Sequence, residues 1–185
     1  MGTWIVLLRG VNLGNHNKLA MPALSATLEA AGFTDVRTHL QSGNVVLGSR
    51  TSSEAKVAEA VAAAVARGHG IECPVVVRTP EQLDGVVAAN PFAEQCAAVD
   101  TKTALKTLHV TFLDAPAPAA AFADVDPAWH SPDELVAVGR EVYLWCPGGY
   151  GRTKLTPAFL ERRTQCTATD RNWNTVLALQ ALARG

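Results

Sequence analysis

The sequence predicts an α+β fold of two packed subdomains, in which helices cover one face of mainly antiparallel sheets. Short apolar runs typical of strands alternate with amphipathic segments, and glycine or proline marks most of their boundaries. The two halves also have a similar order of elements. With 185 residues, 48% of them hydrophobic, the chain can bury one core or two small ones without metals or disulfides.

The first half predicts the element order βαββαβ. The apolar run 4–8, between Gly2 and Gly10, is typical of a strand buried on both faces. Apolar residues at helical spacing predict a helix that begins near Pro22 and ends at Gly32. Side chains alternate in character over residues 36–41, and the apolar run 45–47 follows the break at Ser42-Gly43, which predicts a β-hairpin.

A second helix and a strand complete this order. Thr51 and Glu54 have the spacing of a capping box, and the valines at 57, 61 and 65 share one helical face. The run 75–77 predicts the next strand, so this half matches the split βαβ, or ferredoxin-like, pattern. The name implies no iron–sulfur cluster here, because the cysteines are wrongly spaced. A further helix opens at Thr79-Pro80 and ends at Asn90, and we assign residues 1–90 to the first subdomain.

The second half predicts a truncated version of the same pattern. Residues 91–103 show no clear period and are interpreted as a connection, followed by a strand over 105–113 and a helix over 117–123. Residues 134–138 and 141–146 predict a hairpin around Gly139-Arg140. Helices are then expected from Thr156-Pro157 to about 163 and from Asn172 to about 182. Residues 91–185 therefore predict βαββα plus a C-terminal helix, packed with the first subdomain as one compact unit.

Composition argues against several classes of protein. The 16 basic and 17 acidic residues give a net charge of −1, so no global field attracts nucleic acid or anionic membrane. The four cysteines form no CxxC pair, and the five histidines form no HExxH or i,i+4 pair, so we expect neither a metal site nor a cofactor. The apolar run at the N-terminus is too short for a signal peptide, and no segment has the length of a membrane span. We expect a cytoplasmic protein.

Polar residues gather in four short segments, each with a structural and a functional interpretation. In 9–18, glycines and two cations can bind an anion, or the segment is an ordinary glycine-rich turn. In 41–44, Gly43 and Asn44 suit a hairpin turn, and Ser42 lacks the surroundings of a nucleophile.

The other two segments lie in the second half. Residues 147–154 place three glycines around Tyr150 and lead to Arg152 and Lys154, which suits a phosphate joined to a planar group or a loop with solvated charges. In 170–175, Asn172 is a candidate helix cap, and Trp173 a candidate core anchor. We also place Arg171 near the start of that helix, where a cation needs a nearby anion.

These segments resemble the DUF1697 family of proteins of unknown function. The matching stretches are 8–14 with Asn17-Lys18, 32–37, 41–45, 149–155 and 169–176, whereas Asn15-His16 stands where the family more often has small residues. The resemblance implies a cytoplasmic bacterial protein with two ferredoxin-like subdomains. It implies no activity, cofactor or catalytic residue.

Our leading hypothesis is that the chain binds, or acts on, a phosphorylated or nucleotide-like small molecule at a cleft formed by these loops. The candidate ligand-binding residues are Arg9, Asn12, Lys18, Gln41, Ser42, Asn44, Tyr150, Arg152, Lys154, Arg171, Asn172 and Asn174. Nucleic-acid binding is an alternative, disfavoured by the lack of aromatic residues over 43–48. In a third interpretation the segments only join the subdomains. The sequence predicts neither an enzymatic reaction nor an oligomeric state.

Overall fold

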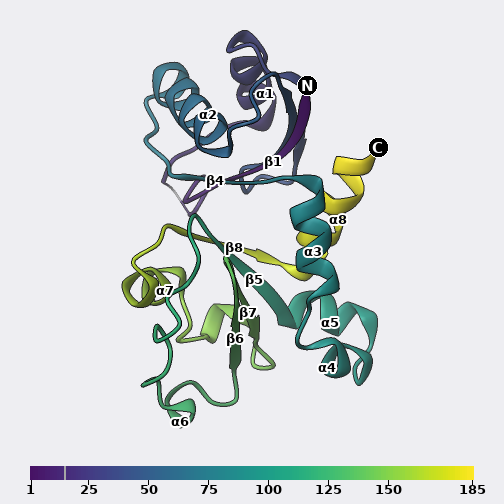
Figure 1. Ribbon diagram of the computed structural model, residues 1–185, viewed down its shortest axis with the longest axis vertical. Coiled ribbons are helices and arrows are strands. Elements are labelled where there is room, and N and C mark those ends of the chain that lie inside the picture. Colours follow the sequence, from purple (N-terminus) through teal and green to yellow (C-terminus); the bar gives the residue numbers. More distant parts are fainter. Residues whose placement is uncertain (15) are drawn as a thin grey trace. The chain divides into compact units, whose positions relative to one another are not determined.

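The structure is a computed structural model that describes residues 1–14 and 16–185. Asn15, one of the two positions that depart from the family pattern, lies outside the described residues. The chain divides into two compact units (Figure 1). Unit 1 comprises Met1–Asp84 and Ala178–Gly185, and unit 2 comprises Gly85–Leu177. The division falls inside two helices, α3 (Pro80–Ala88) and α8 (Trp173–Arg184).

Unit 1 has the predicted order of elements. These are β1 (Gly2–Leu8), α1 (Met21–Ala30), β2 (Thr34–His39), β3 (Asn44–Ser49), α2 (Glu54–His69) and β4 (Val75–Arg78). The strands form an antiparallel sheet in the order β2-β3-β1-β4, the ferredoxin-like arrangement.

The core of unit 1 lies between one face of this sheet and helices α1 and α2. Trp4, Val6 and Leu8 of β1 pack there with Leu24 of α1 and Val61 of α2. The valines at 57, 61 and 65 are all fully buried, as their spacing predicts. The N-terminal cap of α2 differs from the prediction. Ser53, not Thr51, accepts the hydrogen bond from the Lys56 amide, because the helix begins at Glu54.

Unit 2 contains a second four-stranded antiparallel sheet, in the order β6-β7-β5-β8. Its elements are α4 (Ala93–Ala97), α5 (Thr101–Thr107), β5 (Leu108–Leu113), α6 (Pro127–His130), β6 (Glu134–Val138), β7 (Glu141–Trp145), a 3₁₀ turn (Tyr150–Arg152), α7 (Pro157–Thr164) and β8 (Ala168–Asn172). The hairpin around Gly139-Arg140 is confirmed. Thr156 caps α7 through the Phe159 amide, also as predicted.

Strand β8 corrects the expectation of a truncated second half. It pairs with β5 along its whole length and completes the same strand order as in unit 1. Its sequence, Ala-Thr-Asp-Arg-Asn, lacks the apolar alternation on which strand prediction depends. Arg171 therefore lies on a strand and not at the start of a helix.

Two further expectations for unit 2 were wrong. Residues 101–107 form α5 before β5 begins at Leu108, because the Asp100 side chain caps a helix there through the Thr103 amide. Residues 117–123 form no helix but lead into turns over 119–124, and the helix of this connection is α6, which begins at Pro127 after the Asp126 cap. Over the described residues, no helix combines the length and apolarity needed to cross a membrane.

Candidate functional site

In unit 1, Asn12 ties the segment 9–18 to the β2–β3 turn. Its side-chain amide donates to the carbonyls of Leu19, at 2.8 Å, and Gln41, at 2.7 Å. Its carbonyl oxygen accepts from the Leu19 amide at 2.8 Å. With its donors and its acceptor engaged, Asn12 holds two loops together and has little capacity left for a ligand.

The turn 41–44 is built against the end of β1. The Gly43 carbonyl accepts from the Leu8 amide at 2.9 Å. The buried Asn44 side chain donates to the His39 carbonyl and to the Ser42 hydroxyl, at 3.0 and 2.9 Å. Ser42 and Asn44 thus stabilise the turn, in agreement with the structural interpretation of this segment. The side chains of Lys18 and Gln41 are exposed, and Arg9 is half-buried.

Two residues that the sequence analysis did not select, Arg37 and His39, lie on one face of β2. They pair in register with Val46 and Asn44 of β3, and residues two apart on a strand project to the same side. Arg37 Nε and His39 Nε2 are buried and have no hydrogen-bond partner among the described residues. The alternating pattern of residues 36–41 predicts that both side chains lie on one face of the strand. Nothing in the sequence showed that their nitrogen atoms would be buried.

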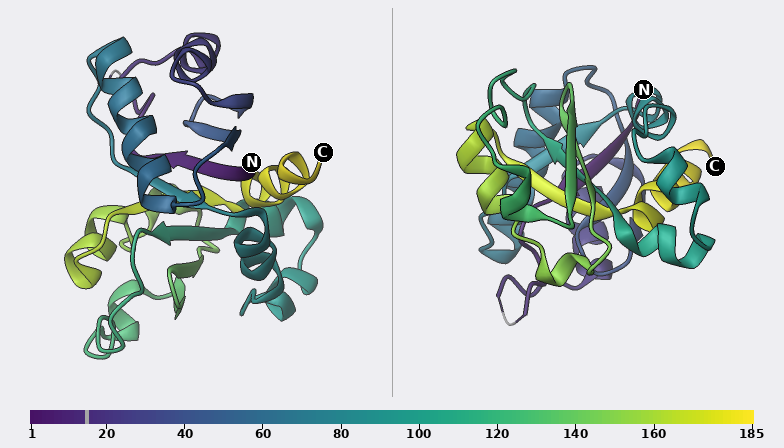
Figure 2. Two further views of the ribbon diagram at one scale, coloured as in Figure 1. Left: turned by 45° about the horizontal axis from the view of Figure 1, so that its top comes forward. Right: turned by 90° about the horizontal axis from the view of Figure 1, so that it is seen from below.

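Arg37 also lines a cavity of about 640 Å³ within unit 1. The rest of the polar lining comes from Asp35 of the same strand and from three further elements: Thr3 of β1, Glu29 of α1 and Arg184 of α8. Figure 2 shows the end of α8 beside the start of β1. Arg184 donates to Asp84 at 2.6 Å, so its charge is already balanced, whereas Arg37 has an unpaired donor.

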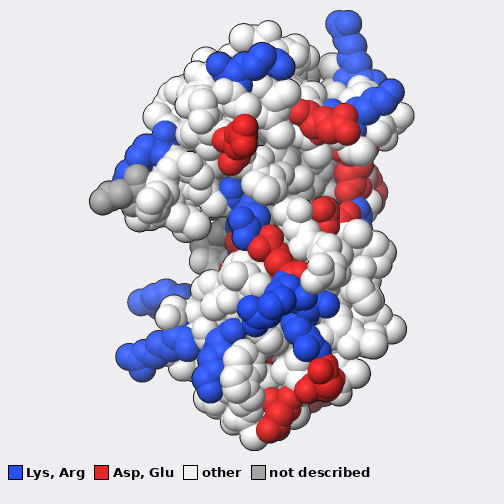
Figure 3. All heavy atoms as spheres, turned by 90° about the vertical axis from the view of Figure 1, so that its left-hand side faces the viewer, with Lys and Arg blue, Asp and Glu red and all other residues white. Residues whose placement is uncertain are grey.

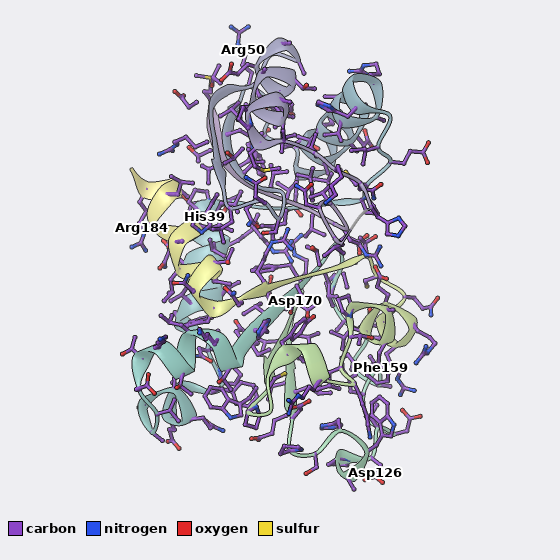
Figure 4. The ribbon with its side chains drawn as sticks, turned by 180° about the vertical axis from the view of Figure 1, so that it is seen from behind. His39, Arg50, Asp126, Phe159, Asp170 and Arg184 are labelled. Carbon is purple, nitrogen blue, oxygen red and sulfur yellow. The ribbon has the colours of Figure 1, made fainter. Side chains whose placement is uncertain are left out.

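Unit 2 contains a cluster of hydrogen-bonded polar side chains on β5 and β8. At its centre is Asp170, which Figure 4 shows on β8. Asp170 hydrogen bonds to His109 Nδ1 at 2.8 Å and accepts from the Thr111 hydroxyl at 3.1 Å. The His109 ring stacks on Tyr150, with centroids 4.1 Å apart, and its Nε2 lies 3.2 Å from the Lys106 carbonyl. Because both ring nitrogens contact protein oxygens, His109 has no free nitrogen to take a proton from a substrate.

One face of the ring of Tyr150, a candidate ligand-binding residue, is covered by His109. Burial, followed by the nearby Asp170 charge, raises the pKa of the Tyr150 hydroxyl. That hydroxyl is buried and makes no hydrogen bond of ordinary geometry with a described residue. Tyr150 therefore serves mainly as a wall of the His109–Asp170 cluster.

The loop Pro147–Lys154 presents two cations with different surroundings. Lys154 donates to the Trp129 carbonyl at 2.6 Å and lies over the Trp129 ring. Arg152 is exposed, and no described residue forms a hydrogen bond or ion pair with its side chain. Figure 3 faces the side of the molecule on which α7 lies, and Lys and Arg side chains gather there.

Arg171 is buried on β8, and its guanidinium donates to the Thr169 hydroxyl and the Asp170 carbonyl, at 2.8 and 2.6 Å. Burial lowers the pKa of Arg171 to about 10, against the opposing effect of Asp170. Asn172 accepts from the Thr175 amide and so caps α8, as the sequence predicts. Trp173 is buried, whereas the Asn174 side chain is exposed.

The two buried cysteines, Cys73 and Cys146, are not reactive thiols. Burial raises the pKa of Cys73 to about 11 and that of Cys146 to about 12. Across the described residues, no group of three His, Cys, Asp or Glu side chains is arranged to hold a metal ion.

The comparisons agree with the fold and assign no activity. The structure of the conserved bacterial protein SP0830 from Streptococcus pneumoniae is similar, with a TM-score of 0.67 over 98% of each chain and 17% identity. A comparison with curated proteins finds no match. The model of a protein family of unknown function, DUF1697, matches residues 1–143, which include all of unit 1 up to Asp84. The chain therefore belongs to the DUF1697 family.

Proposed function

We propose that unit 1 binds a phosphorylated small molecule that also carries hydroxyl groups, such as a nucleotide or a sugar phosphate. The observation that carries the proposal is the buried, unpaired Nε of Arg37 beside the 640 Å³ cavity. A buried donor without a partner costs about 1–3 kcal/mol, and a phosphate oxygen would supply the missing acceptor. Arginine presents its donors in a planar fork that matches phosphate oxygens.

The other polar groups of the cavity favour hydroxyl groups on the ligand. Glu29 and Asp35 line the same cavity as Arg37. Carboxylates accept hydrogen bonds from hydroxyls but repel a second anionic group. A molecule with one phosphate end and one hydroxyl-bearing end therefore fits better than inorganic phosphate. His39, whose Nε2 also lacks a partner, is a second donor on the same face of β2.

Thermal-shift measurements with nucleotides, sugar phosphates and inorganic phosphate test this proposal. Nucleotides or sugar phosphates should raise the Tm of the parent, and Arg37→Gln should abolish the shift. Arg37→Lys keeps the charge but loses the fork, so it should reduce the shift. Arg50→Gln, which changes an exposed arginine in the same unit, is the matched control and should leave the shift intact.

Arg37→Gln has a second, ligand-independent readout. If the Nε is unpaired in the free protein, this variant should unfold at a Tm no lower than that of the parent. A marked loss of stability without ligand would mean that Arg37 has a structural role. A ligand shift that survives in Arg37→Gln would place the site elsewhere.

A second candidate anion contact is the loop Pro147–Lys154 of unit 2. The exposed Arg152 without a described partner favours it, as does the open space beside the Cα atoms of Gly148, Gly149 and Gly151. If this loop is the site, a ligand should still raise the Tm of Arg37→Gln but should no longer raise the Tm of Arg152→Ala. Short RNAs in the same panel test the nucleic-acid alternative, for which binding should weaken steeply with salt.

A further inference from the structure

Strand β6 is an edge strand of unit 2, and its backbone groups alternate in direction. Among the described strands it pairs only with β7, and Val138 and Glu141 close the hairpin on either side of Gly139-Arg140. In a two-residue hairpin the closing pair exchanges backbone hydrogen bonds, and so does every second pair beyond it. Leu135 and Ala137 therefore direct their N–H and C=O groups away from β7.

The connection between β5 and β6 covers the two ends of this edge but not its middle. The Gly139 carbonyl accepts from the Ala117 amide at 2.9 Å. The Asp133 amide donates to the His130 carbonyl at 2.9 Å, and the Asp133 carbonyl contacts His130 Nδ1 at 2.6 Å. No described residue bonds to the outward backbone groups of Leu135 or Ala137, so the free edge consists of four groups on two residues.

A cavity of about 870 Å³ lies along this free edge. Its apolar lining includes Leu135 of β6 together with Phe122 and Val125 of the connection. A second folded sheet would need the space that the connection occupies. A single extended segment would not, because neighbouring strands lie only about 4.8 Å apart.

The charge of the cavity is negative. Asp133 and Glu134 line it, and no Lys or Arg does so among the described residues. Glu134 shares its face of β6 with Val136 and Val138, which are 36% and 40% exposed, whereas Leu135 lies on the opposite face. An added strand would place every second side chain on this face, where its cations would lie beside Glu134 and its aliphatic stems would cover part of both valines.

We infer that the free edge of β6 is a docking site for a short peptide segment in extended conformation, with alternating basic and apolar side chains. The backbone groups of Leu135 and Ala137 bind its main chain, the apolar residues around Leu135 accept one set of side chains, and Glu134, on the opposite face of β6, attracts the basic set. Because His130 and Ala117 occupy the two ends, the bound segment is about four residues long.

Fluorescence anisotropy with a labelled Val-Lys-Val-Lys-Val peptide tests the site. The peptide should bind at least tenfold more tightly than its Val-Glu-Val-Glu-Val counterpart and than a version N-methylated at alternate residues, which cannot form the ladder. Glu134→Lys should reverse the preference between the Lys and Glu peptides. Ala137→Pro removes one outward N–H, a change that edge strands tolerate, and should weaken binding at least tenfold.

The circular dichroism spectrum of Ala137→Pro must match that of the parent, which shows that the variant is folded. If the spectra differ, the result with Glu134→Lys tests the inference independently. Equal binding of the N-methylated peptide, or of the Glu peptide, would overturn the inference. Sedimentation analysis of the protein alone distinguishes a second copy as occupant. A dimer that Glu134→Lys or Ala137→Pro disrupts, without peptide binding, would also overturn it.

Discussion

Gly43 occupies a position that no other residue can fill without displacing its neighbours. Its φ is +70°, and an added Cβ would lie 2.5 Å from Val11 Cγ2 and 2.8 Å from Leu8 Cβ. We expect Gly43→Ala to lower the free energy of unfolding by roughly 2–5 kcal/mol, from overpacking and backbone strain together. Urea denaturation measures this loss.

Gly85 provides the matched control for Gly43. It lies inside α3, and an added Cβ would meet no atom within 4 Å. Gly85→Ala should therefore stabilise the protein by about 1 kcal/mol through helix propensity. Equal effects of the two substitutions would contradict the packing that we describe around Gly43.

The buried thiol of Cys146 links stability to alkaline pH. In the unfolded chain this thiol ionises near its ordinary pKa of 9.0, whereas burial keeps it protonated up to about 12 in the folded protein. The free energy of unfolding should thus fall as pH rises above 9, by up to about 1.4 kcal/mol per pH unit from this group. The stability difference between the parent and Cys146→Ala should narrow between pH 8 and pH 10.5 and stay constant below pH 8.

At this scale the sequence identified the polar residues but not their partners. Asn12 was a candidate ligand contact, and its partner Gln41 lies 29 residues away in the chain. A single sequence does not reveal such a pairing. It therefore could not decide whether Asn12 holds two loops together or contacts a ligand. For Asn172 the partner is a local amide, and the helix-capping prediction was confirmed.

Helix α3 begins with a complete capping box. The Thr79 hydroxyl accepts from the Gln82 amide at 3.2 Å, and the Gln82 side chain accepts from the Thr79 amide at 2.8 Å. Thr79→Ala should lower the free energy of unfolding by about 1 kcal/mol, and Thr79→Ser, which keeps the hydroxyl, should cost much less. Chemical denaturation measures both variants. If Thr79→Ala and Thr79→Ser lose the same free energy of unfolding, the effect comes from the Thr79 methyl group and not from its hydroxyl.

Most helices that the sequence predicted have several local signals, whereas strand β8, which it missed, has none. Helices α1, α2, α3 and α7 have caps, proline or glycine at their ends, and apolar residues at helical spacing. Strand β8 has Asp170 and Arg171 at its centre. Asp170 is satisfied across the sheet by His109 and Thr111 of β5, and Arg171 donates to Thr169 of its own strand. Side-chain pairing across a sheet therefore overrides a polar sequence that by itself favours a turn.

Considered as a whole, the molecule has two sheets with the same strand order. The pattern of the first half was sufficient to predict the ferredoxin-like arrangement of unit 1, and a similar order in the second half indicated another. The contribution of residues 178–185 to unit 1 was not predictable. An amphipathic helix shows which of its faces is buried but not which sheet it covers.

Residues 178–185 should be necessary for the stability of unit 1. Leu179 is buried, and Gln180 and Arg184 both donate to Asp84, at 2.8 and 2.6 Å. Removal of residues 178–185 should accelerate hydrogen exchange in β1 and β2 far more than Asp84→Asn does, because partly exposed polar pairs contribute less than about 1 kcal/mol. Unchanged exchange in the truncated chain would show that residues 1–84 are stable by themselves.

This division has a consequence for synthesis on the ribosome. Residues 1–84 emerge first, but the remainder of unit 1 is encoded after all of unit 2. At about 5–20 residues per second, the ribosome needs roughly 5–20 s to translate the intervening segment. Throughout that interval the first sheet lacks the helical turns that complete unit 1, while a second sheet with the same strand order is being synthesised.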